Sequence, residues 1–428
     1  MDEILVGAYR ADGPKNSRFG AGEAYIIYGS AGLRGAQLDM AEKPAGQSTH
    51  SDEVLPLRGC NIMNAKQQLA HRFHKLLRYS LLAHSVLFKP LKPIQLPTHV
   101  QIEVTTYCNQ DCLSCGRRDI IHQPKHMRFK QFKKIYDEIK PVNINLSGLG
   151  EPLLNPDIFD IIKYCRQHQS IVNFPTNLTL NENIILKLID TQINQIKVSI
   201  DAFSRDTYLI VRQSDKLNIV KRNIELINQI KKERKLDLPE LRLNYAFQKA
   251  NMHELLDIID YAYENNIATI YVQDLNYFSV ESYKPDLCSF NRTDLENLLA
   301  EAERRAQDYG IKTNIRNWQR NMSAFYNKTL PKEDYEENDK HCTFPWVSVF
   351  IDVDGNVKPC PVFVWDKHAN HLGNCLETDF KSIWRGQPYQ TLRQEFRRNI
   401  RSNKICQRCV PPNIVDMNLI FNKMLLKG

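Results

Sequence analysis

Three cysteines lie within eight residues, in the sequence Cys108-Asn-Gln-Asp-Cys112-Leu-Ser-Cys115. Soft metals and iron–sulfur clusters prefer thiolate ligands, so this spacing predicts one inorganic centre held by a single loop. Three protein ligands would leave one iron of a four-iron cluster open to another ligand. A zinc site would need a fourth protein ligand, for which His122 could serve. We expect the cluster, with zinc as the alternative.

A second group of cysteines lies toward the end of the chain, at Cys342, Cys360, Cys406 and Cys409. Clustered cysteines in an unsecreted chain of this length point to a metal site rather than to disulfides. A zinc ribbon is one possible use of the group. The sequence therefore predicts a second inorganic centre in a short domain of its own.

The elements that position these residues alternate between strand and helix. Helical patterns, such as residues 156–168 and 219–234, separate the strand candidates. Six strands alternating with helices favour a parallel α/β sheet, open or closed as a barrel. Chemistry in such folds lies at the carboxyl ends of the strands. The strand candidates are residues 99–105, 142–147, 171–174, 196–200, 241–246 and 269–273.

Glycine and polar residues follow the predicted strands at that edge. The second strand ends in Ser147-Gly148-Leu149-Gly150-Glu151, where small residues allow a ligand to approach the backbone closely. Asn177 follows the third strand, Ser199 and Asp201 end the fourth, and Arg212 lies on the next helix. Taken singly, Asn177 and Ser199 could also be caps or turn formers.

The Cys-x3-Cys-x2-Cys run after a first strand, followed in order by these motifs, resembles the radical S-adenosylmethionine (SAM) enzymes. The resemblance covers about residues 98–412 and implies a partial (β/α)6 TIM-like barrel with a small C-terminal auxiliary-cluster domain. The chain departs from the family at Leu149, where the Gly-Gly-Glu motif has its first glycine, and at Ser114, where a large apolar residue is usual.

The resemblance also implies roles for individual residues. Cys108, Cys112 and Cys115 would hold a [4Fe–4S] cluster that binds SAM. The Ser147–Glu151 turn, with Gly148 and Gly150, would meet the methionine amino group. Polar contacts to the methionine carboxylate and the ribose are implied for Asn177, Ser199, Asp201 and Arg212, and backbone contacts to adenine for Val272 and Gln273.

The C-terminal cysteines resemble the auxiliary domain of the SPASM/twitch group, with a hairpin predicted at Asp354-Gly355. The resemblance implies an auxiliary [4Fe–4S] cluster held by four thiolates, those of Cys342, Cys360, Cys406 and Cys409, with Cys375 as a rival ligand. It implies a 5′-deoxyadenosyl radical that takes hydrogen from a small-molecule or peptide substrate, and an electron donor such as flavodoxin or ferredoxin. The resemblance leaves open whether the enzyme is a dehydrogenase or a peptide or protein maturase.

Residues 1–62 differ from the rest of the chain and hold nine of its 17 glycines. They resemble one blade of an integrin-type β-propeller; because no second copy follows, we expect a fusion or a disordered segment rather than an adhesion fragment. Residues 63–97 predict an amphipathic helix with the apolar stripe Leu69, Phe73, Leu76, Leu77 and Leu81, then a linker. The radical SAM core is assigned to 98–315, a connector to 316–341, the auxiliary domain to 342–412 and a tail to 413–428.

Composition narrows the function further. The formal net charge is +8, a modest basic excess that suits an anionic substrate or cofactor and is no evidence for nucleic acid binding. We do not expect nucleic acid as a partner. A zinc-binding or RNA-binding protein is the non-catalytic alternative. No apolar run reaches the ~20 residues of a membrane span, and with no secretory signal we expect a cytoplasmic protein. In such a protein the clusters among its 11 cysteines point to metal sites rather than to disulfides. Cys165, in mid-helix, is expected to be a buried apolar residue.

Overall fold

The computed structural model describes residues 65–273, 275, 290–316, 342–365, 371–403, 405 and 406. Several predictions lie outside these residues: the propeller-like segment 1–62, nearly all of the connector 316–341, Cys409 and the tail 413–428. Of the N-terminal helix, side chains are described only from Leu77 onward.

The described strands form one eight-stranded sheet in the order β6-β5-β4-β3-β2-β1-β7-β8. The first six neighbour one another in chain order and all pair in parallel, which confirms the six predicted strands. β7 pairs with β1 in parallel, and β8 returns antiparallel beside β7. The strands are β1 (His99–Ile102), β2 (Asn143–Leu146), β3 (Ile171–Thr176), β4 (Gln195–Ser199), β5 (Glu240–Ala246), β6 (Ile270–Gln273), β7 (Ser348–Ile351) and β8 (Val357–Lys358).

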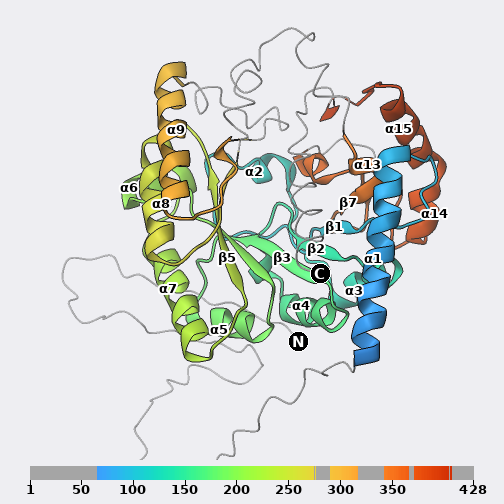
Figure 1. Cartoon of the computed structure of the whole chain (residues 1–428), viewed down its shortest axis with the longest axis horizontal. Helices are drawn as coiled ribbons and strands as arrows, with labels where there is room; N and C mark the ends of the chain where they lie inside the picture. Colours follow the sequence, from blue (N-terminus) through green and yellow to red (C-terminus); the bar gives the residue numbers. More distant parts are fainter. Residues whose placement is uncertain are drawn as a thin grey trace, which may run out of the picture. The chain divides into compact units, whose positions relative to one another are not determined.

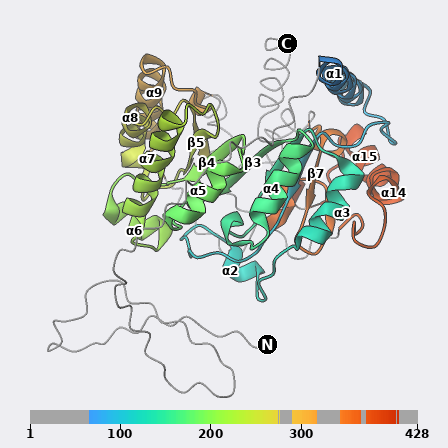
Figure 2. The ribbon, with the colours of Figure 1, turned by 90° about the horizontal axis from the view of Figure 1, so that it is seen from below.

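Helices follow the strands and lie around the outside of the sheet in both views (Figures 1 and 2). The predicted helices at 156–168 and 219–234 are α4 and α7. This arrangement is the parallel α/β sheet that the alternating pattern predicted, and it confirms the partial barrel that the family resemblance implied. The helices of this layer are α3 (Phe129–Ile139), α4 (Ile158–Gln167), α5 (Glu182–Asp190), α6 (Arg205–Arg212), α7 (Leu217–Glu233), α8 (Leu255–Glu264) and α9 (Arg292–Asp308).

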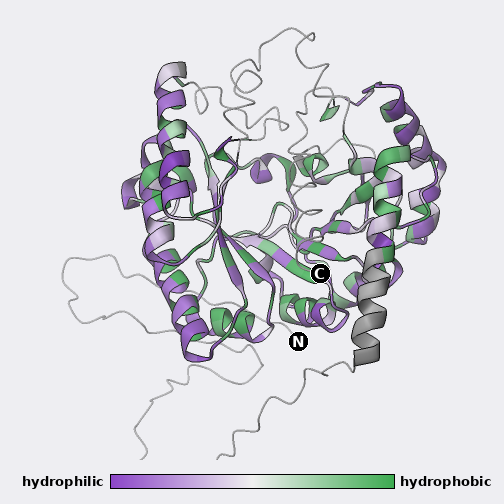
Figure 3. Ribbon diagram, in the orientation of Figure 1, coloured by the Kyte–Doolittle hydropathy of each residue, from purple (hydrophilic) through white to green (hydrophobic). Residues whose placement is uncertain are grey.

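Alternation along the strands decides which side chains face the helices. In β4, Ile196 and Val198 are completely buried in the main hydrophobic core together with side chains of the surrounding helices. Lys197 and Ser199 alternate with them and are only half-buried, so they face the opposite side of the sheet. Hydropathy changes along the strands accordingly (Figure 3). Each buried Val or Ile contributes about 1.5–3 kcal/mol to folding.

The C-terminal region adds to the same sheet. The predicted hairpin is confirmed: Gly355 adopts φ +85° between β7 and β8, a conformation that favours glycine. Buried Arg393 donates from Nη1 to the Leu91 carbonyl, and Trp346 donates from Nε1 to that of Pro90, so this region holds the linker before β1. The helices here are α13 (Phe344–Val347), α14 (Phe380–Arg385) and α15 (Gln387–Arg397).

The predicted helix near residue 63 is α1 (Ala65–Phe88), but its apolar stripe was wrong at Leu77, which is 48% exposed. The face that packs is rotated. Tyr79 and Leu82 are buried against Trp346 of the C-terminal region. The position of Trp346 determines which face of α1 is buried, and the sequence pattern of the helix alone did not identify this packing partner.

Candidate functional site

The three clustered cysteines lie on the loop between β1 and the short helix α2 (Arg117–Ile120). Inside the loop the Cys115 amide donates to the Cys112 carbonyl over 3.1 Å. The Leu113 amide donates to the Val211 carbonyl over 3.0 Å, which fastens the loop to α6. All three thiols are partly buried. The loop is therefore held in place from outside rather than only by its own bonds.

The glycine turn after β2 lies directly against the chain that leads into this loop. A Cβ atom at Gly150 would lie 2.4 Å from the Thr105 carbonyl oxygen and 2.6 Å from that of Tyr107. The amide of Glu151 donates to the same Tyr107 carbonyl over 2.7 Å. Only glycine permits this approach of two backbones, which explains why the turn lacks a side chain there.

Glu151 connects the turn to the end of β3. Its Oε1 accepts hydrogen bonds from the Thr176 hydroxyl (2.8 Å) and the Leu153 amide (3.2 Å), and its Oε2 accepts one from the Asn177 amide (2.7 Å). Burial raises the pKa of this carboxyl to about 7, against which these hydrogen bonds act. The side chain predicted to face a ligand is thus 3% exposed and engaged within the protein.

Asn177 joins the end of β3 to the cysteine loop. Its Nδ2 donates to Asn109 Oδ1 over 2.7 Å, and its Oδ1 accepts from the Thr179 hydroxyl over 2.8 Å. Asn109 Nδ2 donates in turn to Thr179 Oγ1 over 3.1 Å, which closes a ring of three side chains. Asn109 and Thr179 were missed by sequence reasoning. The position of Asn109 between two of the clustered cysteines was the available signal.

Asp201 and Arg212 form a buried ion pair, Oδ2 to Nη2 at 2.5 Å. Asp201 also accepts from the Ala246 amide over 2.6 Å. Arg212 Nη1 lies 3.5 Å from Cys112 Sγ. Burial opposes the charge of Arg212, but Asp201 and Cys112 outweigh it and raise the pKa of the guanidinium. The carboxylate expected beside Arg212 is thus supplied here by the protein itself.

The remaining predicted contacts divide into two groups. Ser147 directly follows β2, and Ser199 ends β4 opposite Asn244 of β5, so both lie at the carboxyl edge of the sheet, as predicted. Val272 differs from the expectation of a backbone contact with adenine. Both its amide and its carbonyl are hydrogen-bonded to the Asn314 side chain at 2.8 Å, which closes this edge strand.

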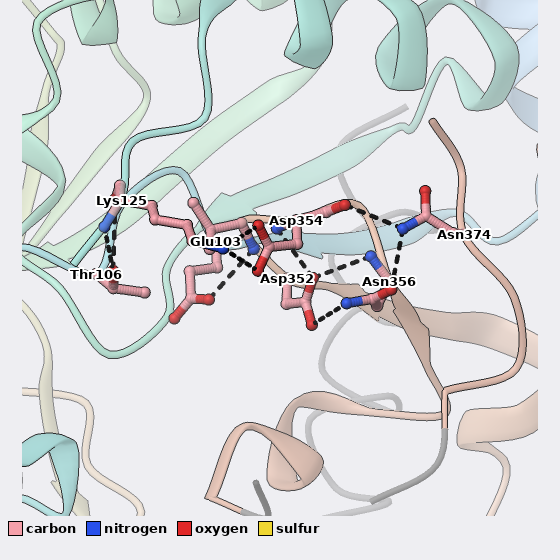
Figure 4. Close-up of polar contacts among 8 residues, drawn as sticks. Glu103, Thr106, Lys125, Asp352, Asp354, Asn356 and Asn374 are labelled. Atoms are coloured by element: carbon pink, nitrogen blue, oxygen red, sulfur yellow. Dashed lines mark hydrogen bonds and ion pairs between the residues drawn. The ribbon is translucent and has the colours of Figure 1, made fainter. Parts of the chain in front are cut away.

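Glu103, which the sequence analysis missed, links the glycine turn to the C-terminal region. Its Oε1 accepts from the Leu149 amide at 2.8 Å and its Oε2 from the Val353 amide at 3.3 Å. Burial raises the pKa of this carboxyl to about 7. Figure 4 shows Glu103 beside Asp352 and Asp354, which continue from β7. The alternating strand pattern around Glu103 gives no indication that this carboxyl group is deeply buried, which is why it was not predicted.

The C-terminal cysteines separate into two environments. Cys342 and Cys406, far apart in sequence, both pack against the cluster of Tyr79, Leu82 and Trp346 and stay partly accessible, as does Cys360. Cys375 is completely buried in the main hydrophobic core, where burial raises its pKa strongly. Cys375, the alternative candidate for a cluster ligand, therefore has the surroundings of an apolar core residue. Cys165 is buried in the same core, as predicted.

The cysteine loop fits an iron–sulfur group by its chemistry. Among the described residues, no three His, Cys, Asp or Glu side chains already surround a point where they could hold a metal ion. Burial raises the pKa of Cys108 to about 11 and also raises that of Cys115, so a bound cation is needed to keep them as thiolates at neutral pH. The Arg212 guanidinium lies beside the Cys112 sulfur, with Nη1 3.5 Å from Sγ.

The structure combines a parallel partial barrel, a cysteine loop that lies against a glycine turn, and a C-terminal region with further cysteines. Together these features define a class of protein that uses an iron–sulfur cluster as a cofactor. The radical SAM superfamily model matches residues 102–262, and the iron–sulfur cluster-binding SPASM model matches 342–410. The chain belongs to the radical SAM superfamily and carries a SPASM domain. These domains indicate [4Fe–4S] clusters and SAM as cofactors. Where the chain is described, no helix has the length and apolar character needed to cross a membrane.

Two relatives and one solved structure illustrate the similarity. A probable GTP 3′,8-cyclase of Methanocaldococcus jannaschii is 27% identical over 61% of this chain and 84% of its own length. A probable GTP 3′,8-cyclase of Methanothermobacter thermautotrophicus is 23% identical over 68% of this chain and 95% of its own. The crystal structure of Streptococcus suis SuiB bound to precursor peptide SuiA has a TM-score of 0.56 at 15% identity, covering 82% of this chain and 77% of that one. The structural likeness supports the fold.

Proposed function

We propose that this chain is a radical SAM enzyme that oxidises or otherwise modifies a small molecule, with peptide modification as the alternative. The observation that carries the proposal is the convergence on one loop: the segment 107–115 is tied to the glycine turn, to the end of β3 and to α6. Cys108, Cys112 and Cys115 would hold the SAM-binding cluster. When bound, this cluster and SAM together would supply one-electron chemistry that generates a 5′-deoxyadenosyl radical.

The chain's own residues position that chemistry. Glu151 fixes the end of β3 against the turn, and Gly150 lets the turn approach the cysteine loop. Arg212 places a positive charge beside Cys112 while Asp201 holds the guanidinium in place. Ser147, Gly148, Asn177 and Ser199 would meet the cofactor at the same edge of the sheet. Exclusion of water by this buried polar shell protects a reactive species.

Cys342, Cys360, Cys406 and Cys409 would hold the auxiliary [4Fe–4S] cluster. A cluster with four thiolate ligands has no open position for substrate and suits the acceptance of an electron from a substrate radical. The names of the 23–27% identical relatives favour a small molecule over a peptide. Flavodoxin or ferredoxin would supply the electron, and we place the protein in the cytoplasm.

The test is anaerobic reconstitution followed by iron analysis and SAM cleavage. The wild-type protein should hold about 8 iron atoms, and the Cys108/Cys112/Cys115→Ala triple variant about 4. Cys165→Ala, in which a buried cysteine of the core is removed, should keep about 8. Dithionite-reduced wild-type protein should release 5′-deoxyadenosine. Zinc in place of iron would refute the cluster assignment, and failure to cleave SAM would refute the catalytic one.

A further inference from the structure

We propose that Tyr389 and Arg393 of α15 donate hydrogen bonds to the auxiliary iron–sulfur cluster and raise its reduction potential. The inference rests on the proposed function, because it assumes an auxiliary cluster on the four C-terminal cysteines. Each of the two side chains carries one buried polar atom that has no hydrogen-bond partner among the described residues. Buried donors of this kind need an acceptor, and the cysteines lie beside them.

One face of α15 meets the C-terminal cysteines. Tyr389, Arg393 and Phe396 share this face, because residues three and four positions apart are neighbours on a helix. Cys342 and Cys406 both pack against the hydrophobic cluster that includes Phe396. The two unsatisfied donors therefore belong to the helix face on which two of the proposed ligands gather.

Arg393 is a buried cation whose charge is not balanced. Its side chain is completely buried, and its Nε donates over 2.9 Å to the carbonyl of Pro345, three residues after Cys342. Its Nη1 donates to the carbonyls of Leu91 (3.0 Å) and Trp384 (2.7 Å). Its Nη2 has no partner within the part of the chain that the structure describes. Burial lowers the pKa of the guanidinium to about 10, so the group stays charged at neutral pH. A buried charge is costly unless it is paired, so we expect an anion beside Nη2.

Tyr389 presents a hydroxyl with the same deficit. The centre of its ring lies 4.7 Å from the guanidinium carbon of Arg393, and the side chain is completely buried. Burial raises the pKa of the phenol, Arg393 lowers it, and Cys375 and Cys360 raise it further. Both thiols are thus near enough to act on the hydroxyl. Cys375 is a residue of the apolar core, whereas Cys360 is a proposed ligand of the auxiliary cluster.

An iron–sulfur cluster would satisfy both groups at once. A [4Fe–4S] cluster with four thiolate ligands carries a net negative charge, and its sulfur atoms accept hydrogen bonds. One added electron makes this charge more negative, so a neighbouring cation and a neighbouring donor stabilise the reduced form more than the oxidised form. A raised potential favours the step in which one electron leaves a substrate radical, which is oxidised, and enters the cluster, which is reduced.

The experiment measures the midpoint potential of the auxiliary cluster in the reconstituted full chain, by electron paramagnetic resonance during stepwise reduction with dithionite. Adding SAM changes the signal of the cluster that has an open iron, so the signal that SAM leaves unchanged reports the auxiliary cluster. At a fixed potential, Tyr389→Phe should shift the ratio of reduced to oxidised cluster toward the oxidised form by at least about threefold.

The matched control is Tyr261→Phe on α8. Tyr261 also has a buried hydroxyl without a partner in the described residues, but Glu225 and Glu264, rather than cysteines, act on it. The control therefore removes the same atom from an equally unsatisfied position, and it should leave the potential of the auxiliary cluster unchanged. A hydroxyl that only fills space in the core would make the two variants behave alike.

Substitutions of Arg393 test the charge. Arg393→Gln removes a cation as well as a donor and should shift the same ratio by at least about tenfold, which corresponds to about 59 mV for one electron. Arg393→Lys keeps the charge and should give a potential between those of Arg393→Gln and the wild type. Circular dichroism and an iron content of about 8 establish that each variant is folded and loaded. Tyr389→Phe leaves the hydrogen bonds of Arg393 in place, so it decides the question even if Arg393→Gln does not fold.

The outcomes separate this inference from the proposed function. An unchanged midpoint potential in Tyr389→Phe, an equal shift in Tyr261→Phe, or an auxiliary cluster that dithionite does not reduce overturns the inference alone. Wild-type protein that holds only about 4 iron atoms overturns the inference together with the auxiliary cluster of the proposed function. A shift that depends on Tyr389 in a protein that does not cleave SAM refutes the proposed function and leaves the inference standing.

Discussion

Replacing Gly150 by alanine tests whether the glycine turn and the cysteine loop are held together by backbone contact. The added Cβ atom would meet the Thr105 carbonyl oxygen at 2.4 Å, whereas real Cβ contacts essentially never fall below 3.0 Å. The two backbones must therefore separate by at least about 0.6 Å, a displacement that lengthens the bond from the Glu151 amide to the Tyr107 carbonyl, now 2.7 Å. Because both obstacles are backbone atoms, no side-chain rotation relieves them. We expect a cost of about 3 kcal/mol.

The assay compares iron content and thermal unfolding of the reconstituted variant with those of Gly310→Ala. Gly310 has φ +67°, yet a Cβ there would have no neighbour within 4 Å, so its cost is conformational only, about 1–2 kcal/mol. Gly150→Ala should lose about 4 of about 8 iron atoms and unfold at a lower temperature than Gly310→Ala. Full iron content together with unfolding no lower than that of Gly310→Ala would refute the reasoning.

Three further tests concern two buried polar groups and the C-terminal cysteines. The pKa of Glu103 is raised to about 7, so the stability that its protonated form contributes is fully present below pH 4.5 and is lost as the pH rises through 7. The free energy of unfolding of the wild type should therefore fall with pH, and Glu103→Gln should remove about 3 kcal/mol of that fall. Urea unfolding at pH 5 and pH 8 measures the difference. Arg212→Gln strands a buried Asp201 carboxylate and should cost about 3–5 kcal/mol, whereas adding Asp201→Asn should restore part of the loss; an additive double variant would contradict the pairing. Cys406→Ala should lose the auxiliary cluster's iron, whereas Cys375→Ala should keep it; the reverse would make Cys375 the ligand.

The fold could be predicted because its signals are local. Each central strand alternates buried aliphatic and polar residues, as Ile196, Lys197 and Val198 do, and this pattern is specific for a strand with two different faces. β7 was not predicted as part of the sheet. Its four residues are all buried and carry no alternation, and pairing with β1 joins positions about 250 residues apart. No spacing rule in the sequence reports such a contact.

The site was predicted less completely for a different reason. Glycine and cysteine have few uses at such spacings, so Gly150 and the three clustered cysteines could be singled out from the sequence. Carboxylates and amides have many uses. Asn177, Asp201 and Arg212 were singled out only through the family resemblance. The contact of Asn177 with Asn109 and the ion pair of Arg212 with Asp201 become evident only when the ends of different strands meet.

The pairing of β1 with β7 gives the C-terminal domain a part in building the first site. β1 lies between β2 and β7, and the Glu103 amide just beyond it donates to the Ile351 carbonyl over 2.9 Å. The side chain of the same residue accepts from Leu149 in the glycine turn and from Val353 after β7. A displacement of the hairpin would therefore move one partner of a buried carboxyl whose other partner lies in the turn. Because an unpaired buried carboxyl is costly, the two regions should shift together rather than independently.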